Sequence, residues 1–128
     1  MARILVIDDV PALTALLRMT LETQGHHVEE AHDGLSGLSK LEREPFDLAI
    51  VDMMMPGLDG IELIRRLRTR DAPQVPGIIA MSGGTDDFPA AFSLNLSAMH
   101  GADRVLYKPF HNSELVTAVG ELLAARAA

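Results

Sequence analysis

One carboxylate, Asp52, lies at the end of an apolar run and just before a turn, in the stretch Phe46-Asp47-Leu48-Ala49-Ile50-Val51-Asp52-Met53-Met54-Met55-Pro56-Gly57. The run up to Val51 is almost wholly apolar, as expected for a strand that is covered on both faces. The Pro-Gly pair is a turn signal. A polar residue at the end of a buried strand is typical of the sites that open α/β sheets carry at one edge.

Three other apolar runs end in polar side chains in the same way. They are Ile4–Ile7 followed by Asp8-Asp9, Gly77–Met81 followed by Ser82, and Val105–Tyr107 followed by Lys108. If the four runs are neighbouring parallel strands, three carboxylates, a hydroxyl and an ammonium group meet at one edge of one sheet.

Apolar runs alternate along the whole chain with segments of helical period. The strands are expected at residues 3–7, 27–31, 47–52, 76–81 and 104–107, and the helices at 12–24, 34–43, 59–70, 88–100 and 112–126. In the first helix one face should hold Leu13, Leu16, Leu17 and Leu21, and Asp33 should cap the second. Five repeats of strand and helix predict an α/β fold, with a mostly parallel sheet between two helical layers.

Composition limits the possible classes of protein. A chain of 128 residues suits one domain, 1–128, with a helical end and no output domain after it. The absence of cysteine excludes a disulfide framework and a thiolate zinc site. A net charge of −7 disfavours direct nucleic-acid binding. With no apolar stretch as long as a membrane span and no signal peptide, a cytoplasmic location is expected.

The residue types at the expected edge suit phosphoryl chemistry. Asp8, Asp9 and Asp52 could hold Mg²⁺, which takes one or two carboxylates together with phosphate oxygens. A carboxylate can also act as the nucleophile and form an aspartyl phosphate. Lys108 could then pair with a phosphoryl oxygen, and Ser82 could donate a hydrogen bond to another.

The chain resembles, over essentially its whole length, the receiver domain of two-component response regulators. The resemblance rests on four stretches in order, namely residues 4–9, 47–60, Met81-Ser82-Gly83 and Lys108-Pro109-Phe110. It implies a flavodoxin-like doubly wound (βα)5 sandwich with five parallel strands in the order 2-1-3-4-5.

The resemblance also implies roles for single residues. Asp52 would accept a phosphoryl group from a histidine kinase or a phosphotransfer protein. Asp8 and Asp9 would bind Mg²⁺ with Asp52 and the backbone carbonyl of Met54, and Mn²⁺ could substitute. Ser82 would be the switch hydroxyl, and Lys108 would hold the phosphate. The Lys108–Pro109 peptide bond would be cis.

Two features depart from the family pattern. The family commonly has Tyr or Phe three residues before the lysine, where this chain has Val105. Tyr107 would project to the same face of the strand, and we hypothesise that it takes part of the switch role. The stretch between Ser82 and Lys108 is also a few residues long, and the extra length is expected within residues 83–88.

The resulting expectation is a stand-alone phosphoacceptor switch that is not an enzyme with an external substrate. It would bind a downstream protein through the fourth helix, fifth strand and fifth helix, or relay phosphate, as a monomer or weak dimer, with neither nucleic acid nor membrane as a partner. Two alternatives stay open. One is a small Mg²⁺-dependent phosphatase with Asp52 as nucleophile, although two positions after Asp52 comes Met54 rather than a second aspartate. The other is a receiver-like binding module that works without phosphorylation.

Overall fold

The computed structural model describes residues 1–69, 75–83 and 101–127. The strands are β1 (Arg3–Ile7), β2 (His27–Ala31), β3 (Leu48–Asp52), β4 (Gly77–Ser82) and β5 (Arg104–Tyr107). The helices are α1 (Pro11–Glu22), α2 (Gly34–Arg43), α3 (Gly60–Arg68) and α5 (Asn112–Ala127). The helix expected at 88–100 and the extra loop length after Gly83 lie outside the described residues.

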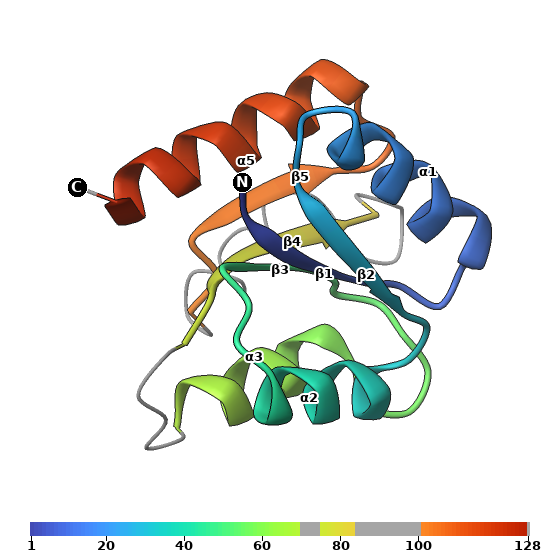
Figure 1. Ribbon diagram of the computed structural model, residues 1–128. Helices are drawn as coiled ribbons and strands as arrows, with labels where there is room; N and C mark the ends of the chain where they lie inside the picture. The colour runs from blue at the N-terminus through green and yellow to red at the C-terminus, as the bar shows by residue number, and fades with distance from the viewer. Residues whose placement is uncertain (70–74, 84–100, 128) are drawn as a thin grey trace.

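All five strands form one parallel sheet in the order β2-β1-β3-β4-β5. The α1 and α5 helices cover one face of this sheet, and α2 and α3 cover the other (Figure 1). The α/β class, the three layers and the strand order are therefore as the sequence and its resemblance predicted.

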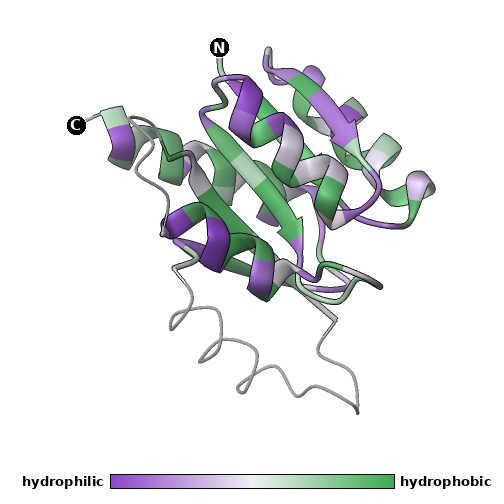
Figure 2. Ribbon diagram, turned by 90° about the horizontal axis from the view of Figure 1, so that it is seen from below, coloured by the Kyte–Doolittle hydropathy of each residue, from purple (hydrophilic) through white to green (hydrophobic). Residues whose placement is uncertain are grey.

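The alternation of side chains along each strand divides the core into two clusters. Ile4, Val6 and Ile50 pack toward α1 and α5, together with Leu17 and Leu115. The intervening strand residues, which include Leu5, Ile7 and Val51, pack toward α2 and α3. In Figure 2 the central strands are hydrophobic along their length, as strands buried on both faces must be.

The expected element ends are close to those observed, with small differences. The helix expected at 12–24 runs from Pro11, its first residue, to Glu22, and the one expected at 59–70 ends at Arg68. The Asp33 cap is present, since its Oδ1 accepts a hydrogen bond from the Ser36 amide at 2.7 Å.

Leu16 lines one groove together with Leu13 and Leu17, but it is not part of the buried core. Its side chain is 49% exposed, whereas Thr14, Leu17 and Leu21 make the buried face of α1. Thr14 can be buried because the Thr14 hydroxyl donates a hydrogen bond to Glu30 Oε1 at 2.6 Å. A buried hydroxyl with a carboxylate partner is satisfied, so the helix needs no leucine at that point.

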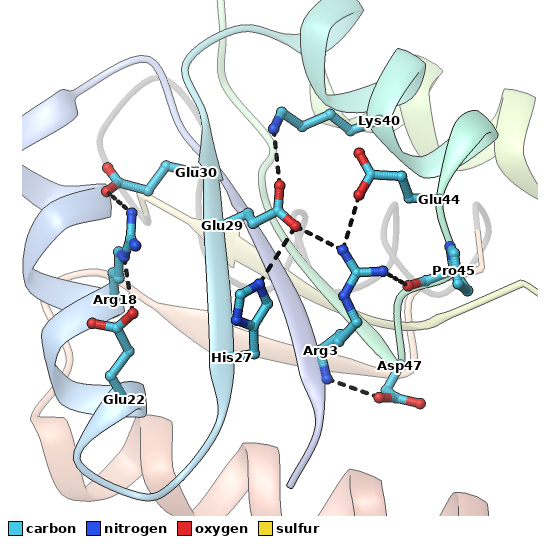
Figure 3. A network of polar contacts seen from close by, with 10 residues as sticks. All are labelled: Arg3, Arg18, Glu22, His27, Glu29, Glu30, Lys40, Glu44, Pro45 and Asp47. Carbon is cyan, nitrogen blue, oxygen red and sulfur yellow. Dashed lines mark hydrogen bonds and ion pairs between the residues drawn. The ribbon is translucent and has the colours of Figure 1, made fainter.

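Both glutamates of β2 are engaged in ion pairs (Figure 3). Glu29 lies between Arg3, at 2.7 Å, and Lys40, at 3.1 Å, and these hydrogen bonds, Lys40 first, lower its pKa. Glu30 pairs with Arg18 at 3.5 Å. These carboxylates therefore connect β2 to its neighbours.

Within the described part of the chain, no helix combines the length and apolar character needed to cross a bilayer.

Candidate functional site

The four predicted strand ends do meet at one edge of the sheet. Asp52 is the last residue of β3 and pairs in register with Met81, the residue before Ser82. Ser82 ends β4 and lies opposite Tyr107, the residue before Lys108. On the other side, Ile7 lies opposite Val51, so Asp8 follows β1 at the same level. The parallel register therefore gathers residues that are up to a hundred positions apart in the chain.

Asp8, Asp9 and Asp52 form a cluster of oxygen donors. One carboxylate oxygen from each lies within 4.8 Å of those of the other two. Asp8 and Asp52 are buried, whereas Asp9 is exposed. Three hard carboxylate oxygens, one of them open to solvent, fit a Mg²⁺ ion that keeps part of its water shell.

Backbone amides hold two of these carboxylates in place. The Val10 amide donates to Asp8 Oδ1 at 2.9 Å, and the Met54 amide donates to Asp52 Oδ1 at 3.2 Å. Both bonds leave the second oxygen of each carboxylate for another partner. The loops that follow β1 and β3 thus orient the acidic groups toward a common point.

Lys108 supplies the positive charge of the site. Its Nζ lies 2.9 Å from Asp8 Oδ2 and 3.5 Å from Asp52 Oδ1. The Lys108 amide donates to the Ser82 carbonyl at 2.7 Å, and the Lys108–Pro109 peptide bond is cis. The ammonium group is therefore beside both buried carboxylates, within reach of a group attached to either.

Burial raises the pKa of Asp52 to about 6. The Lys108 ammonium opposes this by lowering the pKa, the Asp8 carboxylate raises it, and the Met54 amide lowers it. One cation thus offsets two buried carboxylates only in part. A further positive charge at this edge would favour the ionised form of Asp52.

The two candidate switch residues, Val105 and Tyr107, both belong to β5. Val105 packs against the core cluster under α2 and α3. Tyr107 is half-buried and pairs with the buried Ser82 across the sheet. This position next to Ser82 keeps Tyr107 a candidate for sensing a change at the site.

Two features near the site were not apparent from the sequence. An apolar groove of about 310 Å³ runs beside Lys108, between α1 and the start of α5. It is lined by Leu13, Leu16, Leu17, Lys108, Pro109, Phe110 and Asn112. The second feature is a pair of glycines, Gly34 and Gly60, at which a Cβ atom would overlap backbone atoms at the end of β3 or in the loop after it. In sequence both resemble ordinary residues at helix starts, and only the packing of distant segments reveals their contacts.

The family model of the response regulator receiver domain matches residues 4–120 of the chain. The chain belongs to this receiver family. Receiver domains are the regulatory part of two-component response regulators, and the sheet edge described above is at the place where the resemblance predicted the phosphoacceptor site.

Relatives of known name support the same assignment. The chain is 35% identical to the transcriptional regulatory protein TrcR of Mycobacterium tuberculosis, over 94% of this receiver and 45% of that protein. It is 37% identical to a CpxR homolog of Haemophilus influenzae, over 96% and 51%. This receiver thus spans about half the length of the curated relatives that it matches.

A solved receiver structure has the same fold. The receiver domain of the Francisella response regulator 1452 superposes with a TM-score of 0.86 at 28% identity, and the match covers 98% of this chain and 99% of that one. The receiver fold of this chain is thus supported by its own geometry, the family model and a solved structure.

Proposed function

We propose that this receiver is a phosphoacceptor switch in which Asp52 accepts a phosphoryl group from a phosphohistidine. The observation that carries the proposal is the meeting of Asp8, Asp9, Asp52, Ser82 and Lys108 at one sheet edge. The donor is a histidine kinase or a histidine phosphotransfer protein, and the acceptor is a carboxylate oxygen of Asp52.

The transfer step balances without an acid or a base from this chain. A carboxylate oxygen of Asp52 attacks phosphorus, the bond from phosphorus to the donor imidazole nitrogen breaks, and the electron pair stays on that nitrogen. Lys108, already 3.5 Å from Asp52 Oδ1, neutralises charge on the transferred group. The main task of the site is therefore to position groups and to neutralise charge.

The carboxylates fit a divalent cation, and Mg²⁺ is the one that their oxygen donors suit best, with Mn²⁺ as a possible substitute. Asp8, Asp9 and Asp52 would hold it, and the Met54 carbonyl would complete the protein ligands. When bound, the cation supplies positive charge that offsets the repulsion among carboxylates and phosphoryl oxygens.

The switch follows from the new negative charge on Asp52. Lys108 would turn from Asp8 to the phosphoryl oxygens, and the Ser82 hydroxyl would donate to one of them, which favours an active form that the unmodified chain already samples. Tyr107, opposite Ser82, would carry the change to β5 and α5. Those elements would bind a downstream protein, or the phosphate would be relayed.

The groove beside Lys108 supports a protein as the donor. It is apolar, it adjoins the ammonium group of the site, and the nearby Leu16 and Met19 of α1 are 49% and 65% exposed. A helix of a donor protein that covers these side chains would bring its phosphohistidine toward Asp52.

The deciding experiment is phosphorylation with acetyl phosphate, with and without Mg²⁺, followed by intact mass. The wild-type chain should gain one acid-stable, base-labile phosphate that depends on Mg²⁺, and Asp52→Asn should gain none. Asp47→Asn is the matched control, because Asp47 is exposed and its amide replacement can still accept the hydrogen bond from the Arg3 amide.

Three outcomes would contradict the proposal. One is a phosphate on a residue other than Asp52. Another is rapid turnover of phosphate-ester substrates, which would favour the phosphatase alternative. The third is a chain that takes no phosphate and still binds its partner, which would indicate a binding module that works without phosphorylation.

A further inference from the structure

The loop between β3 and α3 is in backbone contact with two helices, each at a glycine. Gly60 is the first residue of α3, and a Cβ built on it would overlap the Asp52 carbonyl oxygen and lie 2.8 Å from the Met53 Cα. Gly34 is the first residue of α2, and a Cβ built there would overlap the Leu58 carbonyl oxygen. Each helix therefore touches the loop where any larger residue would displace its backbone.

The same loop carries the acceptor and a proposed ligand of the cation. It begins at Asp52, includes Met54, and ends at Asp59, whose Oδ1 accepts a hydrogen bond from the Glu62 amide at 2.9 Å. That cap and Gly60 fix the end of the loop to α3. Gly34 is different because it belongs to α2, a helix that contributes no side chain to the acidic cluster.

The contact is specific to the backbone, as a neighbouring glycine shows. Gly37 lies one turn further along α2, and a Cβ there would meet only side-chain atoms of Ile7, the nearest being Cδ1 at 2.6 Å. The end of an isoleucine side chain can turn aside, whereas the Leu58 carbonyl can move only with the loop. The two glycines therefore differ in what a methyl group would displace.

From these contacts we propose that Gly34 is a positioning residue for the divalent cation site, acting through Leu58 and the loop after β3. The α2 helix sets the distance of this loop from the sheet edge, and thereby the place of the Met54 carbonyl relative to Asp8 and Asp9. This inference rests on the proposed function, since it concerns the cation of the same site.

The test is a titration of the full ¹⁵N-labelled chain with MgCl₂, in which binding is followed by the amide NMR signals of residues 52–55, 57 and 58. Gly34→Ala should raise the dissociation constant for Mg²⁺ on the order of tenfold, the size typical of changes to groups that orient metal ligands. Gly37→Ala should lose stability against urea and keep the wild-type affinity for Mg²⁺.

A kinetic measurement separates positioning from a general loss of structure. With acetyl phosphate as donor, Gly34→Ala should need more Mg²⁺ for half-maximal phosphorylation, and its rate at saturating Mg²⁺ should approach that of the wild type. In a chain that is merely destabilised, the rate at saturating Mg²⁺ would also stay below that of the wild type.

A second variant approaches the contact from the loop and remains informative if Gly34→Ala does not fold. Leu58→Gly leaves both helices unchanged and loosens the loop backbone, so it should also weaken Mg²⁺ binding. Wild-type Mg²⁺ affinity in a folded Gly34→Ala, or in Leu58→Gly, would overturn the inference. If the wild-type chain itself binds no Mg²⁺ and takes no phosphate, it is the proposed function that fails.

Discussion

At the scale of single residues, the acceptor site buries two carboxylates, and burial of their charges lowers the stability of the folded state. Asp52 is 4% exposed, and among the residues that the structure describes its only cationic partner is Lys108, which it shares with Asp8. Burial of a carboxylate that is paired only in part raises its pKa and makes ionisation costly in the folded state. The site is thus less stable in the absence of a cation that offsets the two buried carboxylates.

This cost predicts how stability depends on pH. In the folded state the pKa of Asp52 is about 6, above its ordinary value of 3.8, so the native chain holds this proton more tightly than the unfolded chain does. The associated stability is complete below about pH 4 and is lost as the pH rises through 6. At pH 8 the loss approaches about 3 kcal/mol, at about 1.4 kcal/mol for each tenfold change in proton affinity.

Asp52→Asn should therefore have a higher free energy of unfolding than the wild type at pH 8 in EDTA, and the difference should shrink toward zero near pH 4. Urea unfolding at several pH values measures this difference in unfolding free energy between the two proteins. Saturating Mg²⁺ should make the difference at pH 8 smaller. If the unfolding free energies of the wild type and Asp52→Asn differ by the same amount at pH 4 and pH 8, this account of Asp52 is wrong.

At the scale of helices and strands, periodicity alone predicted the described elements to within about two residues. It placed Leu17 and Leu21 on one face of α1, and both are buried, but it could not predict that Thr14 is buried with them, because the hydroxyl partner of Thr14 is Glu30 of β2. The sequence did predict which residues end each strand. The contact between Asp8 and Lys108 depends on how the strands pair, which periodicity does not specify. The groove between α1 and α5 also depends on this pairing, and only the structure revealed it.

Strand β5 is the element that should transmit phosphorylation. Tyr107→Ala should accept phosphate as the wild type does, but show smaller changes in the amide NMR signals of β5 and α5 on phosphorylation, because the ring opposite Ser82 is gone. Tyr107→Phe, which keeps the ring, is the control. If Tyr107→Ala also leaves phosphorylation-dependent partner binding unchanged, Tyr107 has no switch role.

At the scale of the whole molecule, the groove adjoins the site at Lys108, while the ion pairs of Glu29 and Glu30 connect β2 to β1, α1 and α2. An acceptor carboxylate beside an apolar groove suits docking of a protein. A small phosphodonor such as acetyl phosphate needs the acceptor site but not the groove.

Leu16→Glu should therefore slow phosphotransfer from a histidine kinase by tenfold or more, on the order of the loss of one interface hot spot, and leave phosphorylation by acetyl phosphate unchanged. Leu35→Glu is the matched control, since Leu35 is also an exposed leucine, on α2, and does not line the groove. Equal slowing in both variants, or in neither, would place the donor elsewhere.

The ion pairs of β2 also bear on self-association. Because β2 is an outer strand of the sheet, its free backbone groups could template a further strand from another copy of the chain. Glu29 and Glu30 project from opposite faces of that strand and hold cationic side chains beside it. A strand from another copy would have to accommodate these charges, which disfavours amyloid-like stacking at the β2 edge of the sheet.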